Sequence, residues 1–343
     1  MHFCNSDILF GKFLSHQDMV TKDDVINAFR FILGRDPENE EIVARYATEF
    51  NDIKTLRARL LNSAEFSQKY AAPAKRALMP LNGSPLAVDI DVSETQMIAL
   101  FSRIKAQWEY LGSTEPHWSV LISDSYFQKN FQMHRDVFYA SGKTEVNQFN
   151  KTLDRNNVAV DRTAVCLELG CGVGRVTWQL ARLCQQVVAV DISSSHLDVA
   201  RAYLAEVGID NVQLCHIAEL PMVESLPRFD LLYSRIVLQH NPPPVMAWLL
   251  DKLLKRMNPG GIAYFQIPTY RIGYRFNVEE YLVNPNIKSM EMHYLPQPEL
   301  FRILTRRGCQ LMEVREDDAI GAPDASALSN TVLVRKAKTV NPA

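Results

Sequence analysis

From Thr163 onward, short apolar segments alternate with amphipathic ones, and this rhythm constrains the fold more than any other feature of the sequence. Apolar segments rich in Val, Ile and Leu are typical of buried strands, and the amphipathic stretches between most of them are typical of helices. Such alternation predicts an α/β fold with a parallel sheet covered by helices on both faces. The segments span residues 165–169, 187–192, 212–217, 229–233, 262–267, 310–314 and 331–335.

A glycine-rich turn, Gly170-Cys-Gly-Val-Gly174, follows the first of these strands directly. Glycine lets a ligand approach the backbone where a Cβ atom would collide with it. We expect a helix to begin near Val173 and to direct its free N–H groups at the same point. In an open α/β sheet, ligands bind outside the carboxyl ends of the strands, so the sequence predicts a ligand site at this turn.

The residues around the turn indicate which ligand it binds. A dinucleotide fingerprint requires glycine at position 175, where this chain has Arg175, so a nicotinamide dehydrogenase is disfavoured. Asp191 ends the next strand and is placed to accept hydrogen bonds from the two hydroxyls of a ribose. Glu168 precedes the glycines and suits a ligand with cationic amino and sulfonium groups better than a pyrophosphate.

Four sequence runs in this region, E-x-G-C-G-x-G, V-D-I-S, F-D-L-L-Y-S and N-P-G-G, resemble those of class I S-adenosylmethionine-dependent methyltransferases. The resemblance covers residues 163–336 and implies S-adenosylmethionine as the cofactor. It also implies a Rossmann-like sheet of seven strands, mostly parallel with the last strand antiparallel. The cofactor-binding residues implied are Glu168, Gly170, Cys171, Gly172, Gly174, Asp191, Ile192, Ala218, Glu219, Ser234 and Val237.

Within that set the resemblance implies separate roles. The three glycines would line the methionine part of the cofactor, Asp191 would hold the ribose, and Ile192 would pack on the adenine. The aspartate that the family often uses beside the adenine amino group is missing here. Either the backbone of Ala218 or the side chain of Glu219 would make that contact.

A run of prolines after Asn241 imitates the N-P-P-aromatic motif of amine methylation. It begins eleven residues past Asp230, which is too late, and it lacks the aromatic residue. Proline suits the first turn of a helix, so we interpret the run as a helix start.

Methyl transfer to a hydroxyl requires a base, and two histidines are candidate catalytic residues. His240 follows the fourth strand, and the alternative, which the sequence favours, is a structural residue that anchors that loop. His293 lies with Glu291 in an insertion at about 268–296, which in this family commonly builds the acceptor pocket.

Tyrosines offer an aromatic face and a hydroxyl to an acceptor. The candidate substrate-binding residues are therefore Tyr270, Tyr274, Tyr281 and Tyr294; we expect no metal.

The chain divides into a helical module (1–72), a linker (73–90), a helical cap (91–160) and the methyltransferase core (161–338). The first part resembles a helical module of unknown function from bacterial surface-glycan proteins. The matching residues are Phe31-Ile-Leu-Gly-Arg-Asp-Pro37 and Asn62-Ser-Ala-Glu-Phe66. That resemblance implies docking to glycan-assembly enzymes and no catalysis.

The composition limits which binding partners and which cellular compartment are expected for this protein. Lys and Arg total 37 against 39 for Asp and Glu, giving a net charge of −2, so nucleic acid is a poor candidate partner. We find no apolar segment long enough to span a membrane and no secretory signal at the N-terminus. The six cysteines form no C-x-x-C pair. Reduced thiols in a cytoplasmic protein are therefore expected.

We accordingly expect an enzyme, an S-adenosylmethionine-dependent methyltransferase that acts on a sugar or glycan hydroxyl in polysaccharide biosynthesis. The runs 237–243 and Trp108-x-x-Leu-Gly112 favour this acceptor because they are similar to uncharacterised methyltransferases that accompany glycan-building enzymes. One alternative acceptor is a small metabolite, a lipid or a protein side chain. Another alternative is a catalytically silent scaffold that binds the cofactor.

Overall fold

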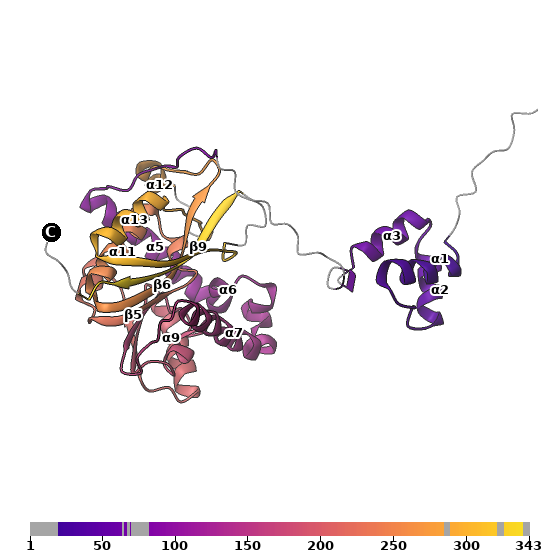
Figure 1. Ribbon diagram of the computed structural model, residues 1–343, viewed down its shortest axis with the longest axis horizontal. Coiled ribbons are helices and arrows are strands. Elements are labelled where there is room, and N and C mark those ends of the chain that lie inside the picture. The colour runs from indigo at the N-terminus through magenta and orange to yellow at the C-terminus, as the bar shows by residue number, and fades with distance from the viewer. Residues whose placement is uncertain are drawn as a thin grey trace, which may run out of the picture. The chain divides into compact units, whose positions relative to one another are not determined.

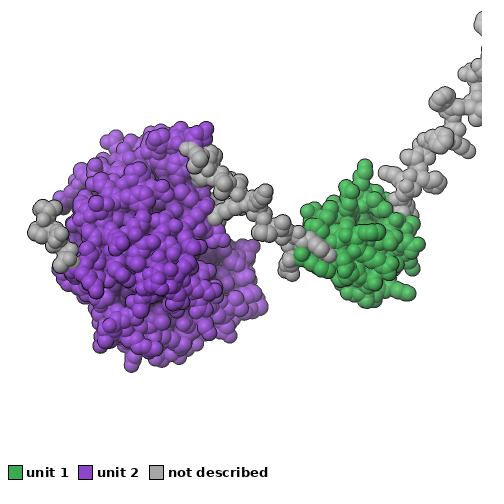
Figure 2. All heavy atoms as spheres, in the orientation of Figure 1, with its two compact units in different colours: residues 1–76 green, residues 77–343 purple. Residues whose placement is uncertain are grey.

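The computed structural model describes residues 20–63, 65, 66, 69, 82–284, 289–320 and 326–338. The chain separates into two compact units, residues 1–76 and residues 77–343, which Figure 2 colours separately. Cys4 and the end of the predicted module at 70–72 lie outside the described residues.

The first unit is a small helical bundle. Its described elements are α1 (Lys22–Ala28), η1 (Phe29–Leu33), α2 (Glu40–Glu49) and α3 (Ile53–Leu61). Val25, Leu33 and Leu56 are almost fully buried in its core. Gly34 ends η1 with a φ of 63°, a backbone conformation that favours glycine. Phe31 stands out on the surface, 87% exposed.

The second unit contains a seven-stranded sheet with the order β4-β3-β2-β5-β6-β9-β8. Neighbouring strands from β4 through β6 are parallel, and β9 runs antiparallel to both β6 and β8. The predicted α/β fold, with a mostly parallel sheet and an antiparallel last strand, is therefore confirmed. The strands are β2 (Val165–Leu169), β3 (Gln186–Asp191), β4 (Val212–His216), β5 (Phe229–Ser234), β6 (Met257–Arg271), β8 (Cys309–Asp317) and β9 (Ala327–Lys336).

Strand β6 is much longer than the predicted segment 262–267. Its first residue, Met257, pairs with Phe229 of β5, and its last, Arg271, pairs with Ala327 of β9. The apolar run marks only the stretch buried on both faces, whereas pairing with a neighbour on each side extends the strand into polar sequence.

Helices cover both faces of the sheet (Figure 1). One face packs against α7, α8 and α9 in one apolar cluster, and the other packs against α5, α10, α11 and α13 in a second. The helices are α5 (Glu94–Thr114), α6 (Pro116–Val120), η2 (Asp124–Tyr126), α7 (Gln128–Arg155), α8 (Thr177–Leu180), α9 (Ser194–Glu206), α10 (Leu220–Ser225), η3 (Leu238–His240), α11 (Pro243–Arg256), α12 (Val278–Val283) and α13 (Gln297–Arg306). The proline run after Asn241 starts α11, as interpreted above.

The helix expected to begin near Val173 begins instead at Thr177 and has four residues. Gly172 and Gly174 adopt φ values of 52° and 80°, outside the right-handed helical region, so the chain cannot enter a helix before it has passed them. The expectation of a helix N-terminus at the turn was wrong for this reason.

The described part of the predicted linker, residues 82–90, contains β1 (Ala87–Val88). This strand pairs in parallel with β7 (Arg275–Phe276), which lies in the predicted insertion. Asp89 also accepts a hydrogen bond from the backbone N–H of Val278, at the start of α12. This segment therefore packs as part of the second unit.

A close approach between α7 and the turn after β2 yields a testable prediction. A Cβ atom at Gly142 would lie 1.9 Å from the backbone oxygen of Arg175. Alanine normally stabilises a helix interior relative to glycine by up to about 1 kcal/mol, but here we expect Gly142→Ala to lower the free energy of unfolding by about 1–3 kcal/mol. Urea denaturation would measure it, with the exposed Lys143→Ala on the same helix as control. A stabilised Gly142→Ala protein would contradict the packing.

Candidate functional site

A cavity lies at the carboxyl ends of β2, β3 and β5, where the strand order reverses on either side of β2. This is the place where open α/β sheets bind ligands. The empty space, including the part open to solvent, is about 1130 Å³. Residues that follow the strands line one side of it, and residues of α5 and α6 line another: Phe101, Ile104, Trp108, Ser119 and Val120.

The glycine turn forms a wall of the cavity with no room for side chains. A Cβ atom at Gly170 would lie 2.3 Å from Val237 Cγ2, and one at Gly172 would lie 2.9 Å from Val120 Cγ2. Gly170, with a φ of 73°, also adopts a left-handed conformation. Gly174 lies against Ala200 of α9 and does not line the cavity.

Asp191 connects the turn to the end of β3. One carboxylate oxygen accepts the N–H of Gly172 at 2.8 Å, and the other accepts the N–H of Ser193 at 2.9 Å. The residue lines the cavity and is 9% exposed. Because each carboxylate oxygen can accept a second hydrogen bond, Asp191 can still bind a pair of ligand hydroxyls.

Glu168 is buried in the cavity wall at 3% exposure. Burial raises the pKa of its carboxyl from 4.5 to about 7, against the lowering effects of the Thr177 hydroxyl and the Arg175 charge. Among the described residues, its Oε2 atom has no hydrogen-bond partner. A buried, unsatisfied carboxylate oxygen suits a cationic ligand group.

His240 takes part in a hydrogen-bond chain whose direction is fixed by a backbone N–H. Ile236 N–H donates to Gln266 Oε1 over 3.1 Å, so the Gln266 amide nitrogen donates to Gln239 Oε1 over 3.0 Å. Gln239 then donates to His240 Nε2 (3.1 Å), and His240 Nδ1–H donates to the backbone oxygen of Glu291 (2.9 Å).

This chain makes His240 a neutral anchor. Burial lowers its pKa to about 4, and both ring nitrogens are engaged. It does not line the cavity, whereas Trp108, whose ring centroid lies 5.2 Å from that of His240, does. In this arrangement neither ring nitrogen is free to take a proton from an acceptor. Of the two roles left open for His240, the geometry favours the structural one.

His293 and the four tyrosines are not among the residues that line the cavity, and several of their polar atoms bind other parts of the protein. His293 Nδ1 lies 2.9 Å from the Tyr274 hydroxyl. Tyr281 donates to Glu291 at 2.5 Å, and Tyr270 donates to the backbone oxygen of Ser84 at 2.8 Å. Tyr294 is 2% exposed. The structure therefore does not bring the candidate base His293 or the candidate substrate tyrosines to the cavity.

The structure brings together most of the predicted cofactor residues but not all of them. The predicted residues that line the cavity are Glu168, Gly170, Cys171, Gly172, Asp191, Ile192 and Val237. Ser234 instead donates to the backbone oxygen of Leu169, and Glu219 is exposed before α10. Ala218 lies outside the lining, and its backbone oxygen accepts a hydrogen bond from Lys105 at 3.3 Å.

The lining residues that were not predicted as site residues include Arg175 and Tyr233. Arg175 entered the sequence argument only as evidence against a dinucleotide, and Tyr233 only as part of a strand. A charged residue directly after a glycine turn is a signal that could have identified the first of them.

Three further findings concern the described residues. None of their helices is long and apolar enough to cross a membrane. They contain no group of three or more His, Cys, Asp or Glu side chains placed to hold a metal ion. Their cysteines are all free thiols: Cys166, Cys171, Cys184, Cys215 and Cys309.

The fold and cavity define a doubly wound α/β protein with a ligand site at its switch point. In sequence, residues 167–263 match a family described as a methyltransferase domain. The match covers the glycine turn, Asp191, β5 and the first half of β6.

Two relatives each match about a third of this chain. A ubiquinone biosynthesis O-methyltransferase of Shewanella pealeana is 28% identical over 99 residues, which is 29% of this chain and 41% of that protein. A trans-aconitate 2-methyltransferase of Deinococcus radiodurans is 33% identical over 105 residues, 31% of this chain and 38% of that protein. The chain thus spans less than half of the length of these relatives.

Among solved structures, the magnesium protoporphyrin IX methyltransferase of Synechocystis with bound S-adenosylhomocysteine is 17% identical. It covers 68% of this chain and 100% of its own, with a TM-score of 0.46.

The Glu168 carboxyl gives a pH prediction. A cationic ligand group requires the ionised form, which decreases as the pH falls below about 7. We therefore expect the affinity for S-adenosylmethionine to fall roughly 10- to 30-fold between pH 7.5 and 5.5. Calorimetric titration at each pH would measure this, with Glu168→Gln as a variant whose affinity should stay nearly constant. An affinity independent of pH in the unmodified protein would contradict the assignment.

The His240 chain gives a stability prediction. His240→Ala removes a buried ring and takes its partner from the Gln239 side-chain nitrogen and from the Glu291 backbone oxygen. We expect the free energy of unfolding to fall by about 2–4 kcal/mol. His134→Ala, on the partly exposed side of α7, is the control for chemical denaturation. If both variants unfold alike, the anchoring role is wrong.

Proposed function

We propose that this protein is a methyltransferase that uses S-adenosylmethionine to methylate an oxygen atom of its acceptor. The observation that carries the proposal is the cavity wall built from the glycine turn and Asp191, within a segment that matches a methyltransferase domain. The name of the Shewanella relative, a ubiquinone biosynthesis O-methyltransferase, favours an oxygen acceptor.

The residues present fit this cofactor. The turn excludes Cβ atoms where a ligand approaches, Glu168 has an unpartnered oxygen for a cationic amino group, and Asp191 retains acceptor capacity for ribose hydroxyls. Ile192 and Ile217 offer apolar surface for a purine. The cofactor supplies an activated methyl group on a sulfonium.

Catalysis by this chain would be chiefly positioning. Aligning a donor and an acceptor in a site that excludes water can contribute about 7–11 kcal/mol. Trp108, Ser119 and Val120 from α5 and α6 close the cavity over the glycine turn, so these cap residues would exclude water and orient the acceptor.

For the acceptor, a sugar or glycan hydroxyl remains the class that the sequence favours. The relatives reported above are named for ubiquinone biosynthesis and trans-aconitate instead, so a small metabolite is the competing class.

A cytoplasmic location and docking of residues 1–72 to glycan-assembly enzymes remain predictions. So do the linker and cap boundaries at 73–90 and 91–160.

Binding of S-adenosylmethionine is the first test. We expect saturable heat from calorimetric titration with S-adenosylmethionine and none with NAD. Asp191→Ala should weaken binding at least about 100-fold because it removes the acceptors for two ribose hydroxyls, while Asp198→Ala, exposed on α9, should bind normally. Circular dichroism would verify that both variants are folded. Unchanged affinity in Asp191→Ala would contradict the ribose assignment, and no binding at all would contradict the function.

Acceptor chemistry is the second test. Once a screen of glycans and small acids yields product, single-turnover rates of His240→Ala and His293→Ala would be compared at saturating cofactor. From the geometry, we expect neither variant to lose the chemical step while binding the cofactor normally. A selective loss of rate in either one would identify it as the base.

A further inference from the structure

The cavity has an apolar end to which no ligand group has been assigned. Six of the residues that line it are apolar and belong to a single packed cluster, and they form what we call the apolar lobe: Phe101, Ile104, Val223, Leu226, Leu249 and Leu253. They come from α5, from α10 and the residues after it, and from α11. The lobe therefore lies between these helices, on one face of the sheet.

The lobe offers a ligand no hydrogen bond from a side chain. Its six side chains are all hydrocarbon, and their residues are between 0% and 7% exposed. A hydroxyl or amide placed in such surroundings loses its hydrogen bonds to water and gains none in return. Enclosed apolar space in proteins instead stays dry and accepts hydrocarbon. The chemistry of the lobe thus favours an apolar group and disfavours a bare sugar.

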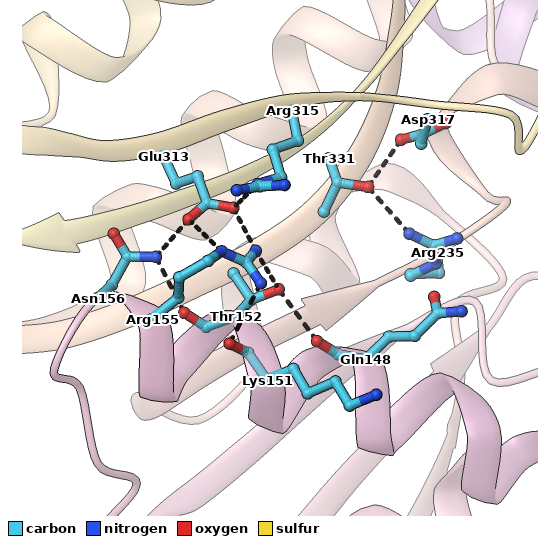
Figure 3. A network of polar contacts seen from close by, with 10 residues as sticks. All are labelled: Gln148, Lys151, Thr152, Arg155, Asn156, Arg235, Glu313, Arg315, Asp317 and Thr331. Atoms are coloured by element: carbon cyan, nitrogen blue, oxygen red, sulfur yellow. Dashed lines mark hydrogen bonds and ion pairs between the residues drawn. The ribbon is translucent and has the colours of Figure 1, made fainter.

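A second recess, on the other face of the sheet, has the opposite character. It lies beside α7, β8 and β9, and most of its lining residues are charged. There Arg155 donates to Glu313, while Thr331 donates to Asp317 and accepts from Arg235 (Figure 3). The protein therefore lines these two recesses with different chemistry, and of the two only the lobe suits an apolar ligand.

The lobe extends away from the place proposed for the purine. Ile192 and Ile217 directly follow β3 and β4, so they lie at the carboxyl edge of the sheet. Helix α11 leads from the end of β5 back to the start of β6, which is parallel to β5, so its later residues lie farther from that edge. Leu249 and Leu253 on this helix are separated by about 6 Å along its axis. A purine at the edge leaves this depth unoccupied.

We infer that the apolar lobe binds a hydrocarbon group of the acceptor, a short alkyl chain or a single ring, while the oxygen to be methylated stays in the polar part of the cavity. The inference rests on the proposed function, because it takes the cavity as the place where donor and acceptor meet. Phe101 and Ile104 lie on the same helix as Trp108, which lines the cavity over the glycine turn. One helix would therefore position both ends of the acceptor.

Straight-chain alcohols from butanol to octanol are the probes, titrated calorimetrically into the protein saturated with S-adenosylhomocysteine. We expect the affinity to rise about three- to fourfold for each added CH2 group, and to level off once the lobe is full. Hexanediol with a hydroxyl at each end should bind about tenfold more weakly than hexanol, because its second hydroxyl would be buried without a partner.

Two variants that each add one methylene test whether the lobe is open space. Val223 lines the lobe, whereas Val245 is fully buried in the same cluster and does not line the cavity. Val223→Leu should leave the midpoint of urea denaturation unchanged or raise it, and the alcohol series should level off about one CH2 group earlier. Val245→Leu, the matched control, should lower the midpoint because it overpacks a filled core, and should leave the alcohol series unchanged.

Several outcomes would overturn the inference. Alcohols that bind only without S-adenosylhomocysteine would show that the lobe holds part of the cofactor. An affinity independent of chain length, or equal for hexanol and hexanediol, would show that the site is not apolar. Equal losses of stability in the two variants would show that there is no space beside Val223. In the acceptor screen, a bare sugar or a small acid as the best acceptor would also contradict the inference.

These results are separate from the proposed function. Each of them leaves the binding of S-adenosylhomocysteine intact, so the lobe can be wrong while the cofactor assignment stands. If S-adenosylhomocysteine itself does not bind, the proposed function fails. The alcohol titration of the cofactor-free protein then still decides whether the lobe accepts hydrocarbon.

Discussion

The carboxylate of Asp191 is the contact on which the rest of the site depends. By accepting the N–H groups of Gly172 and Ser193, it joins the turn after β2 to the segment that leads from β3 into α9. The turn can meet it only because Gly170, Gly172 and Gly174 adopt positive φ. Those conformations delay α8 to Thr177 and leave the cavity between the turn and the end of β3.

Helix α5 completes the site by contacting both of its sides. Glu109 accepts the N–H of Ser194 at 2.8 Å, at the N-terminus of α9, where a carboxylate is favoured by the helix dipole. Gly112 allows α5 to approach α9 closely, since a Cβ atom there would lie 2.5 Å from Ser193 Oγ. On its other side, α5 pairs Arg103 with Glu291. One helix therefore fixes both the segment after Asp191 and the predicted insertion.

The ion pair between Arg103 and Glu291 explains why the positions of the side chains in the insertion could not be derived from the sequence. The strands could be predicted because burial on two faces dictates their composition residue by residue. Tyr281 instead donates to Glu291, which Arg103 binds from more than 180 residues away in the chain, and Tyr274 contacts His293. Tyrosine spacing within the insertion carries no information about such a partner. The turn and Asp191 were predictable because their conformation is encoded locally, in consecutive glycines and a strand end.

The electrostatic state of Glu168 likewise depends on the fold and not on the local sequence. Sequence placed Glu168 before the glycines, but only the fold shows that it is buried without a partner and that its pKa is near 7. A carboxyl whose folded pKa is raised costs no stability below its unfolded pKa of 4.5. Its cost grows as the pH rises from the unfolded pKa toward the folded pKa of about 7 and levels off above it, at about 3 kcal/mol. A bound ammonium removes that cost, so part of the cofactor's binding free energy would come from relieving a strain that the empty protein carries at neutral pH. This energetic coupling between an unsatisfied buried charge and its ligand is why the cavity tolerates groups that a structural core would exclude.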